Sequence, residues 1–517
     1  MPEFFEMKKR LALIILLLIL LLSAFLRLYH ISDYMTFLGD EGRDVLVVKD
    51  MLGGNLTLLG PRSSAGDFFM GPAYYYLMTP FLWLFRMDPV GPAVMVALFG
   101  IATVFLIYFV GKRFFNEKAG LFAAALYAVS PVIITYSHSS WNPNVLPFFS
   151  LLLVYMLYKA ILSKTPWKYF VFAGFLLGIA LQLHYLSLFL GVVSAFFIFF
   201  GQWYESRKLV FVKTVKAYLQ FFVGFLIGFS PFIAFEMRHE YLNTKALIKF
   251  VFGGTAQAGR ESGMSFIQII SDVFFRIFAK LVFFFPSPDR YDLFQPVALK
   301  SFGITVVVLA IAAVIYIFYM RNKVAKLVLI AWLFLGVLLF GLYKQFIFDY
   351  HFAFLFPLPF LLIGNLFSQL QNKKRVWIKV LAITIFGAAF LYNLYGMPFR
   401  YEPNRQRDQV KKIAEFVLSQ AHDKPFNFAL ITGGNSDHAY RYYFEINNRR
   451  PVVIENDVLD PQRKTVTDQL LVVCEDTSCQ PVGHPLWEVS GFGRAEIAGV
   501  WDVSVVKVYR LVHYKGE

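Results

Sequence analysis

Apolar runs recur along most of this 517-residue chain, and their length limits what the chain can fold into. A helix needs about 20 mostly apolar residues to cross the hydrocarbon core of a bilayer. Such runs lie near residues 10–28, 89–110, 119–136, 144–162, 168–182, 184–202, 217–236, 301–320, 325–343, 350–368 and 376–395. The sequence therefore predicts an all-α polytopic membrane domain with about eleven spanning helices in the lipid bilayer.

The first run follows Met7-Lys8-Lys9-Arg10, so a cleaved signal peptide is an alternative interpretation. The apolar part of a signal peptide is shorter, about 7–15 residues, and a cleavage site with small residues follows it. Here Arg27-Leu28-Tyr29-His30 follows instead. We therefore expect the first run to remain in the protein as a span.

The chain has a net charge of +15, and its basic residues gather in short clusters between the apolar runs. With a cytoplasmic N-terminus, these clusters fall in the inner loops near residues 112–118, 159–168, 207–216, 321–326 and 373–379. This bias is typical of cytoplasmic loops, and it explains the charge without a nucleic-acid partner. We expect an integral protein of a prokaryotic plasma membrane, with a cytoplasmic N-terminus and an extracytoplasmic C-terminal domain.

Two long outer loops, 29–88 and 237–300, separate the spans. The apolar stretch 74–86 is too short to cross a bilayer, so we expect it to lie in the membrane surface. The charged residues of stretch 265–285 recur every four positions and would share one helical face: Asp272, Arg276 and Lys280. A helix with this polar stripe is also expected to lie in the membrane interface.

After about residue 397 the composition becomes that of a water-soluble domain. Apolar residues recur with helical spacing over 405–421. Short apolar runs predict strands at 427–431, 451–454, 470–474 and 503–511. The sequence therefore predicts a membrane domain over residues 1–396 and a small α/β domain over residues 397–517. Cys474 and Cys479 would pair if this domain lies in an oxidising compartment.

The most informative polar stretch is Gly39-Asp40-Glu41-Gly42-Arg43-Asp44, shortly after the first span. It places three carboxylates and an arginine beside a membrane surface. One interpretation is structural: Asp40 caps a helix over residues 41–52. The other is catalytic: a carboxylate at the bilayer edge accepts a proton from an acceptor hydroxyl. The residues alone favour neither.

A second motif precedes the second span: Asp67-Phe68-Phe69-Met70-Gly71-Pro72-Ala73-Tyr74-Tyr75-Tyr76. Gly-Pro is a turn signal, and tyrosines are frequent at membrane interfaces. Without further context, this motif favours a structural role.

In this order the two motifs resemble the protein O-mannosyltransferase superfamily and the bacterial transferases that move aminoarabinose onto lipid A. These proteins are integral-membrane glycosyltransferases of the GT-C fold. The resemblance covers roughly residues 1–395. It extends to further motifs: Gly111-Lys112-Arg113-Phe114-Phe115, Ala119-Gly120-Leu121, Ser130-Pro131, Tyr350-His351-Phe352 and Phe356-Pro357-Leu358-Pro359.

The resemblance implies transfer of a sugar from a polyprenyl-phosphate carrier to a hydroxyl of a lipid, glycan or protein, on the outer face of the membrane. Asp40 would be the general base, and Glu41 would support it or orient the acceptor. Arg43 would bind the donor phosphate. Some relatives have a lysine in the second motif where this chain has Met70, which leaves the phosphate ligand open. Further candidates for that role are Lys344, Arg260 and Arg276.

The carrier phosphate is a good leaving group, so one carboxylate and one or two cations suffice for this chemistry. A direct displacement inverts the anomeric centre. No cofactor is required; a divalent metal could take part, but the sequence has no ligand motif for one. We expect a group of further residues to line the substrate site: Asp67, Tyr74, His138, Asp349 and His351. Of these, Asp349 and His351 could form a pair.

The main alternative function is a transporter or flippase for a lipid-linked sugar. Such proteins usually carry ionisable residues near the middle of their spans, and the predicted spans have almost none. A scaffold whose C-terminal domain binds a partner is a second alternative, but it would not require the Asp40 cluster. The sequence therefore favours a glycosyltransferase of the cell envelope. We expect its C-terminal domain to gate the site or select the acceptor rather than to catalyse the reaction. The polar cluster Asn435-Ser436-Asp437-His438 is the part of the domain that fits this expectation least.

Overall fold

The computed structural model describes residues 2–63, 68–206, 211–252, 264–285, 297–343, 346–476 and 478–516. The chain forms two compact units. The first contains residues 1–29, 57–77 and 94–402, and the second contains residues 30–56, 78–93 and 403–517.

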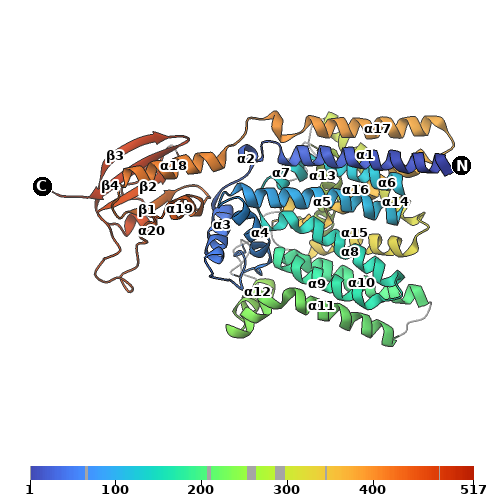
Figure 1. The fold of residues 1–517 in the computed structure, drawn as a ribbon, viewed down its shortest axis with the longest axis horizontal. Helices are drawn as coiled ribbons and strands as arrows, with labels where there is room; N and C mark the ends of the chain where they lie inside the picture. The colour runs from blue at the N-terminus through green and yellow to red at the C-terminus, as the bar shows by residue number, and fades with distance from the viewer. Residues whose placement is uncertain are drawn as a thin grey trace. The chain divides into compact units, whose positions relative to one another are not determined.

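Long helices that run alongside one another dominate the first unit (Figure 1). In the described part of the chain, nine helical segments are long and apolar enough to cross a membrane. Their helices are α1 Pro2–Leu28, α5 Val90–Phe114, α8 Leu146–Leu162, α9 Pro166–Leu183, α10 Leu188–Ser206, α11 Phe211–Arg238, α14 Val297–Phe318, α15 Lys323–Leu338 and α17 Val376–Tyr395. Two further pairs of helices are bent at a short break, and the number becomes eleven if each pair counts as one span. They are α6 Glu117–Ala128 with α7 Pro131–Ser137, and η4 Asp349–Leu355 with α16 Pro357–Gln371. The prediction of about eleven spans is confirmed.

Further helices lie between these segments: α2 Ile31–Tyr34, α3 Gly39–Leu52, α4 Ala73–Leu84, η1 Asn142–Val145, η2 Tyr185–Ser187, α12 Leu242–Phe252, α13 Phe266–Phe283, η3 Leu339–Leu342 and η5 Pro398–Arg400. The predicted surface stretch 74–86 thus corresponds to α4. Its placement in the membrane surface stays a prediction.

The charged stretch 265–285 corresponds to α13, and its placement in the membrane interface stays a prediction. Its apolar residues Val273, Ile277 and Phe278 are fully buried, and the helix packs against α14, α15 and α16. The charges of its polar stripe find partners within the protein. Helix α13 is therefore part of the helical bundle.

Arg27 fixes the bend between α6 and α7. A helix end leaves carbonyls without partners in the same helix. The buried guanidinium of Arg27 donates to the carbonyls of Tyr127 at 3.2 Å and Ala128 at 3.0 Å, and to Ser23 Oγ at 2.9 Å. A cation is also favourable at the negative end of a helix dipole. Arg27 therefore joins α1 to the end of α6.

Helices α9 and α11 pack closely through a pair of glycines on each helix. Gly174 and Gly178 of α9 face Gly224 and Gly228 of α11, and both pairs have the Gly-x-x-x-Gly spacing. A Cβ atom at Gly224 would lie 1.8 Å from the carbonyl oxygen of Val171. Small residues at this spacing let membrane helices approach closely. Any side chain larger than hydrogen would force the two helices apart.

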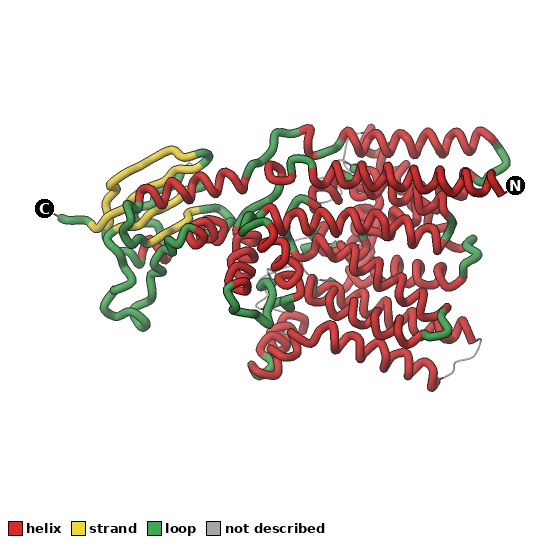
Figure 2. The backbone as a smooth tube through the Cα atoms, in the orientation of Figure 1, coloured by secondary structure: helices red, strands yellow, loops and turns green. Residues whose placement is uncertain are grey.

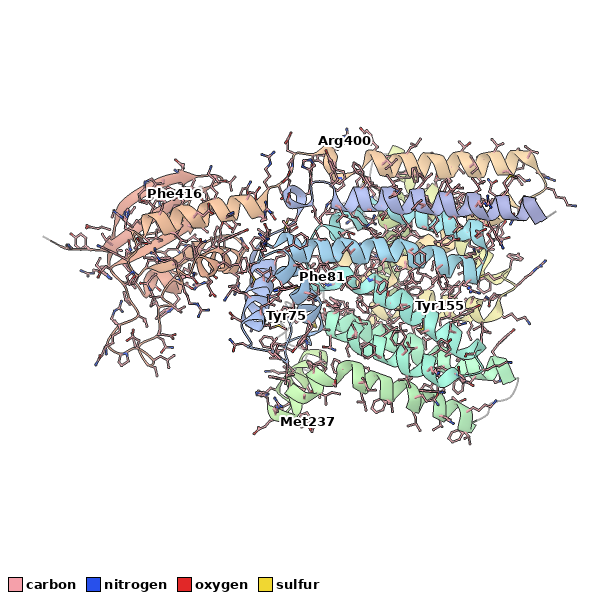
Figure 3. The ribbon with its side chains drawn as sticks, in the orientation of Figure 1. Tyr75, Phe81, Tyr155, Met237, Arg400 and Phe416 are labelled. Carbon is pink, nitrogen blue, oxygen red and sulfur yellow. A yellow bond between two sulfur atoms is a disulfide. The ribbon has the colours of Figure 1, made fainter. Side chains whose placement is uncertain are left out.

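The strands form one mixed sheet near the C-terminus (Figure 2). They are β1 Asn427–Ile431, β2 Gln469–Cys474, β3 Ala495–Val503 and β4 Val506–His513, in the order β1-β2-β4-β3. β1 and β2 are parallel, and the other pairs are antiparallel. The accompanying helices are α18 Gln406–Gln420, α19 His438–Ile446 and α20 Trp487–Ser490. Phe416 of α18 (Figure 3) packs edge-on against Trp501 of β3, with 5.6 Å between ring centroids.

The small α/β region confirms the predicted fold class, and Cys474 and Cys479 are joined by a disulfide. The boundary between residues 396 and 397 stays a prediction. Two predicted strands need correction. Residues 451–454 do not form a strand; their apolar character arises because Ile454 packs into the core beside the sheet. The run 503–511 covers the end of β3, a turn at Ser504 and most of β4. β3 itself was missed because much of it is exposed.

We predict that Gly224→Leu lowers the melting temperature of the protein in detergent. The added side chain would overpack the contact with α9, which typically costs about 1–3 kcal/mol. Gly387→Leu on α17 is the matched control, because a Cβ atom there would meet nothing within 4 Å. Equal melting temperatures for the two variants would contradict the close packing of α9 and α11.

Candidate active site

Asp40 lies exposed in the first turn of α3. The helix begins at Gly39, two residues earlier than the sequence predicted, and Leu38 is its N-cap residue. The N–H of Leu38 donates to Glu41 Oε2 at 3.1 Å, so Glu41 rather than Asp40 satisfies the backbone at this end. Glu41 is 6% exposed, whereas the side chain of Asp40 is 55% exposed. The predicted capping role of Asp40 is therefore wrong, and its carboxylate is the accessible one of the pair.

Arg43 connects Asp40 to a buried carboxylate. Its Nη1 lies 2.8 Å from Asp40 Oδ1. Its Nε and Nη2 donate to Asp44 Oδ1 at 2.9 and 2.8 Å, and the side chain of Asp44 is fully buried. Anchoring by Asp44 holds the guanidinium beside Asp40. The first two turns of α3 thus present an exposed carboxylate next to a fixed cation.

His438 is a further titratable group in the second unit. It is the first residue of α19, and its Nδ1 lies 2.7 Å from Ser436 Oγ. Burial lowers the pKa of His438; the charge of Asp437 opposes this effect and the charge of Arg43 adds to it. The imidazole is therefore mainly neutral near pH 7. The sequence marked this residue as polar but gave it no role.

A separate charged cluster surrounds Asp349 in the first unit. Arg276 of α13 bonds Asp349 Oδ1 through Nε at 2.9 Å and through Nη2. Lys280 Nζ lies 2.6 Å from Asp349 Oδ2, and Arg276 Nη1 lies 3.2 Å from Asp272 Oδ2. Among the described residues, Arg276 and Lys280 thus both pair with Asp349, and Arg276 also pairs with Asp272. Asp349 pairs with these cations rather than with His351, and the role of Arg276 as a phosphate ligand stays a prediction.

His351 lies in a buried group of aromatic rings. Its ring centroid is 4.5 Å from that of Tyr350, 5.5 Å from that of His184 and 5.7 Å from that of Tyr343. The hydroxyls of Tyr185 and Tyr343 are hydrogen-bonded to each other. Sequence reasoning missed these two tyrosines, because tyrosine is common at membrane edges and their contact joins distant positions.

The remaining predicted site residues are buried or lie outside the described residues. Tyr74 is fully buried, and its hydroxyl lies 2.9 Å from Ser140 Oγ. His138 is 2% exposed, and its ring centroid lies 5.8 Å from that of Phe399. Their contact with a substrate stays a prediction. Three predicted residues lie outside the described part of the chain: Asp67, Arg260 and Lys344.

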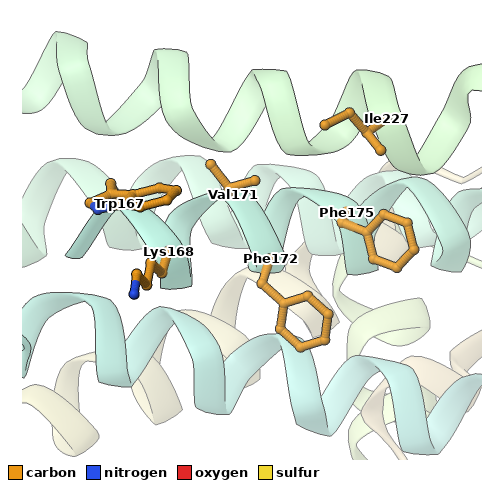
Figure 4. A pocket seen from close by; sticks show the side chains of 6 residues that line it. All are labelled: Trp167, Lys168, Val171, Phe172, Phe175 and Ile227. Atoms are coloured by element: carbon orange, nitrogen blue, oxygen red, sulfur yellow. The ribbon is translucent and has the colours of Figure 1, made fainter. Parts of the chain in front are cut away.

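Two further features do not contribute a catalytic group. Among the described residues, no group of three His, Cys, Asp or Glu side chains is arranged to hold a metal ion, and metal dependence stays untested. A hollow of about 390 Å³ lies between α9 and α11 (Figure 4). Its lining is largely apolar: Trp167, Lys168, Val171, Phe172, Phe175 and Ile227. This lining contains no acid–base pair.

The sequence of part of the chain matches a known family. Residues 70–235 match the family described as dolichyl-phosphate-mannose-protein mannosyltransferase. The putative mannosyltransferase YkcB of Bacillus subtilis (strain 168) is 28% identical over 197 residues. That match covers 38% of this chain and 27% of YkcB, well under two thirds of the relative.

The fold is similar to those of solved membrane proteins. ArnT from Cupriavidus metallidurans in the apo state matches with a TM-score of 0.60 and 13% identity, over 96% of this chain and 97% of ArnT. ArnT bound to undecaprenyl phosphate matches with a TM-score of 0.59 and 12% identity, over 97% of both chains. The archaeal oligosaccharyltransferase AglB from Archaeoglobus fulgidus, in complex with an inhibitory peptide and a dolichol-phosphate, matches with a TM-score of 0.54 and 13% identity, over 90% of this chain and 69% of AglB. These matches confirm the resemblance drawn from the sequence: the chain has the GT-C fold of integral-membrane glycosyltransferases, with a mannosyltransferase-family match over residues 70–235.

Proposed function

We propose that the protein transfers a sugar from a polyprenyl-phosphate carrier to a hydroxyl of a lipid, glycan or protein, on the outer face of the membrane. The observation that carries this proposal is the exposed carboxylate of Asp40 beside the anchored guanidinium of Arg43. A base for the incoming hydroxyl and a cation for the departing phosphate are the two groups that this reaction needs. Both lie on helix α3.

The comparisons support the class of donor. ArnT has been solved with undecaprenyl phosphate, and AglB with a dolichol-phosphate. Both ligands are polyisoprenoid phosphates, and the fold of this chain is similar to that of both proteins. A carrier of this class is the donor that we propose for the chain.

In the proposed reaction, Asp40 takes the proton of the acceptor hydroxyl. The acceptor oxygen forms a bond to the anomeric carbon while the bond from that carbon to the carrier phosphate breaks. The phosphate leaves with the electron pair of that bond, and Arg43 stabilises its growing negative charge. Attack opposite the leaving group inverts the anomeric centre.

Asp349 is less suited to the role of base than Asp40. Arg276 bonds one oxygen of its carboxylate, and Lys280 bonds the other. Both oxygens of the Asp349 carboxylate are thus engaged in ion pairs, and its side chain is only 8% exposed. In the described contacts, Asp40 uses only Oδ1 toward Arg43, and most of its side chain is exposed.

We predict that Asp40→Asn lowers turnover by about 10²- to 10⁴-fold, the usual range for loss of a general base. Turnover is measured in nanodiscs with a radiolabelled polyprenyl-phosphate sugar. Thermal stability, measured in parallel, should change by about 1 kcal/mol or less, because the carboxylate is exposed and its ion pair lies at the surface. Near-normal turnover would eliminate Asp40 as the base.

We predict that Arg43→Lys weakens donor binding by about 10- to 100-fold. An ammonium keeps the charge but cannot hydrogen-bond to both Asp40 and Asp44 at once, as the guanidinium does. Lysine is preferable to alanine here, because alanine would leave the buried carboxylate of Asp44 without this cation. That loss alone lowers the free energy of unfolding by about 3–5 kcal/mol. Titration with the polyprenyl phosphate measures the affinity. An unchanged Kd would show that the phosphate binds elsewhere.

We propose a cytoplasmic N-terminus and an extracytoplasmic C-terminal domain, on the basis of the basic clusters between the spans. To test this, single cysteines replace Val376, the first residue of α17, and Arg450, which follows α17 in the C-terminal region. In intact cells, a membrane-impermeant thiol reagent should label the cysteine at 450 and should reach the one at 376 only after permeabilisation. The reverse pattern would refute the topology, and the outer-face site with it.

A further inference from the structure

The helix that carries Asp40 is in direct backbone contact with α19 of the C-terminal region; both belong to the second unit. A Cβ atom at Gly42 would lie 2.3 Å from the backbone nitrogen of Ala439. One at Gly39 would lie 2.0 Å from Ser436 Oγ. The two glycines that flank the Asp-Glu pair therefore leave room for α19 and the segment before it.

Asn435 supplies the hydrogen-bond acceptor that the start of α3 lacks. The first amides of a helix have no partner within that helix. Glu41 accepts a hydrogen bond from the amide of Leu38, and the amide of Gly39 donates to Asn435 Oδ1 at 2.9 Å. The first turn of α3, which includes Asp40, is thus held by a side chain almost four hundred positions later in the sequence.

Asn435 is itself held by Glu475, which directly follows β2. Asn435 Nδ2 donates to Glu475 Oε1 at 2.9 Å. Glu475 also accepts from Tyr440 OH at 2.9 Å and from Thr432 Oγ1 at 2.7 Å. The disulfide between Cys474 and Cys479 closes the loop that starts at Glu475. Hydrogen bonds therefore run from the sheet through Glu475 and Asn435 to the first turn of α3.

Two contacts elsewhere support the same attachment. Lys49 Nζ, near the end of α3, lies 3.0 Å from Glu445 Oε2 of α19. The amide of Phe37, just before α3, donates to Gln406 Oε1 at 3.1 Å. The C-terminal region therefore contacts α3 from just before its first residue to Lys49, while the side chain of Asp40 stays exposed.

We propose that Asn435, fixed by Glu475, is a positioning residue for Asp40, so that the C-terminal region sets the geometry of the base. This inference rests on the proposed function of Asp40. A displacement of about 1 Å in a reacting group can cost about 10²-fold in rate. Arg43 is anchored separately by Asp44, one turn further along α3. Loss of Asn435 should therefore affect turnover far more than donor binding.

The test compares Asn435→Leu with a reversed pair, Asn435→Asp combined with Glu475→Gln. The reversed pair keeps an acceptor for Gly39 and exchanges carboxylate and amide between the two positions. Asn435→Leu should lower kcat by about 10- to 100-fold, with the Kd for the polyprenyl phosphate within about threefold of wild type. The reversed pair should restore kcat. Asn447→Leu is the control, because this asparagine directly follows α19 and donates only to Tyr443 O of that helix among its described side-chain contacts.

Hydrogen exchange of residues 37–44 gives a readout that does not depend on activity. Asn435→Leu should speed exchange there, and the reversed pair should restore protection. Slow exchange and wild-type kcat in Asn435→Leu would overturn the proposal. Fast exchange with unchanged kcat would overturn the catalytic part of it. If the wild type transfers no sugar from any donor, the proposed function fails, and exchange alone then decides whether Asn435 holds α3.

Discussion

The hydrogen bond from the Gly39 amide to Asn435 connects the proposed base to the sheet of the C-terminal region. A helix cannot satisfy its own first amides, so the place where α3 begins depends on an acceptor from elsewhere. The absence of side chains at Gly39 and Gly42 lets α19 come close enough to provide it. The position of Asp40 is thus determined by residues outside the stretch that contains it.

The same constraint recurs among the spans, where it is stricter. The hydrocarbon core offers no water to backbone groups that a break in a helix leaves unpaired. Arg27 donates hydrogen bonds to the carbonyls at the end of α6. Ser130 and Asn393 donate to two carbonyls at the end of α13. In each case the donor lies outside the helix whose carbonyl it bonds. The hydrogen bonds at these helix bends and ends therefore also hold the bundle together.

Most of the fold could be predicted from the sequence because a span is a local property. Length and apolarity alone gave the spanning segments to within a few residues. The errors concern features that depend on distant partners. The packing of α13 could not be predicted, because Asp349, the partner of Arg276 and Lys280, lies 73 positions from Arg276. The edge strand β3 was missed because half-exposed strands lack a clear apolar run.

In the candidate site, too, local features could be predicted from the sequence and contacts with distant residues could not. The Asp-Glu-x-Arg pattern was sufficient to identify Asp40 and Arg43 as neighbours, because positions three apart share a helical face. It could not assign the capping role to Glu41, since that depends on where α3 begins. The sequence also gave no reason for the glycines at 39 and 42, where a Cβ atom would meet Ser436 and the backbone of Ala439. Only the fold could identify that backbone as α19 and its partner as Asn435.

The proposed function requires that the protein breaks the bond between a sugar and its lipid phosphate, rather than moving the lipid-linked sugar intact. The most direct test supplies purified wild-type protein in sealed vesicles with a panel of radiolabelled polyprenyl-phosphate sugars and hydroxyl acceptors. We expect label on an acceptor, an equal amount of free polyprenyl phosphate, and inverted configuration at the anomeric carbon. Passage of the intact lipid-linked sugar between leaflets, with no label on any acceptor, would contradict the proposed transferase and favour a flippase.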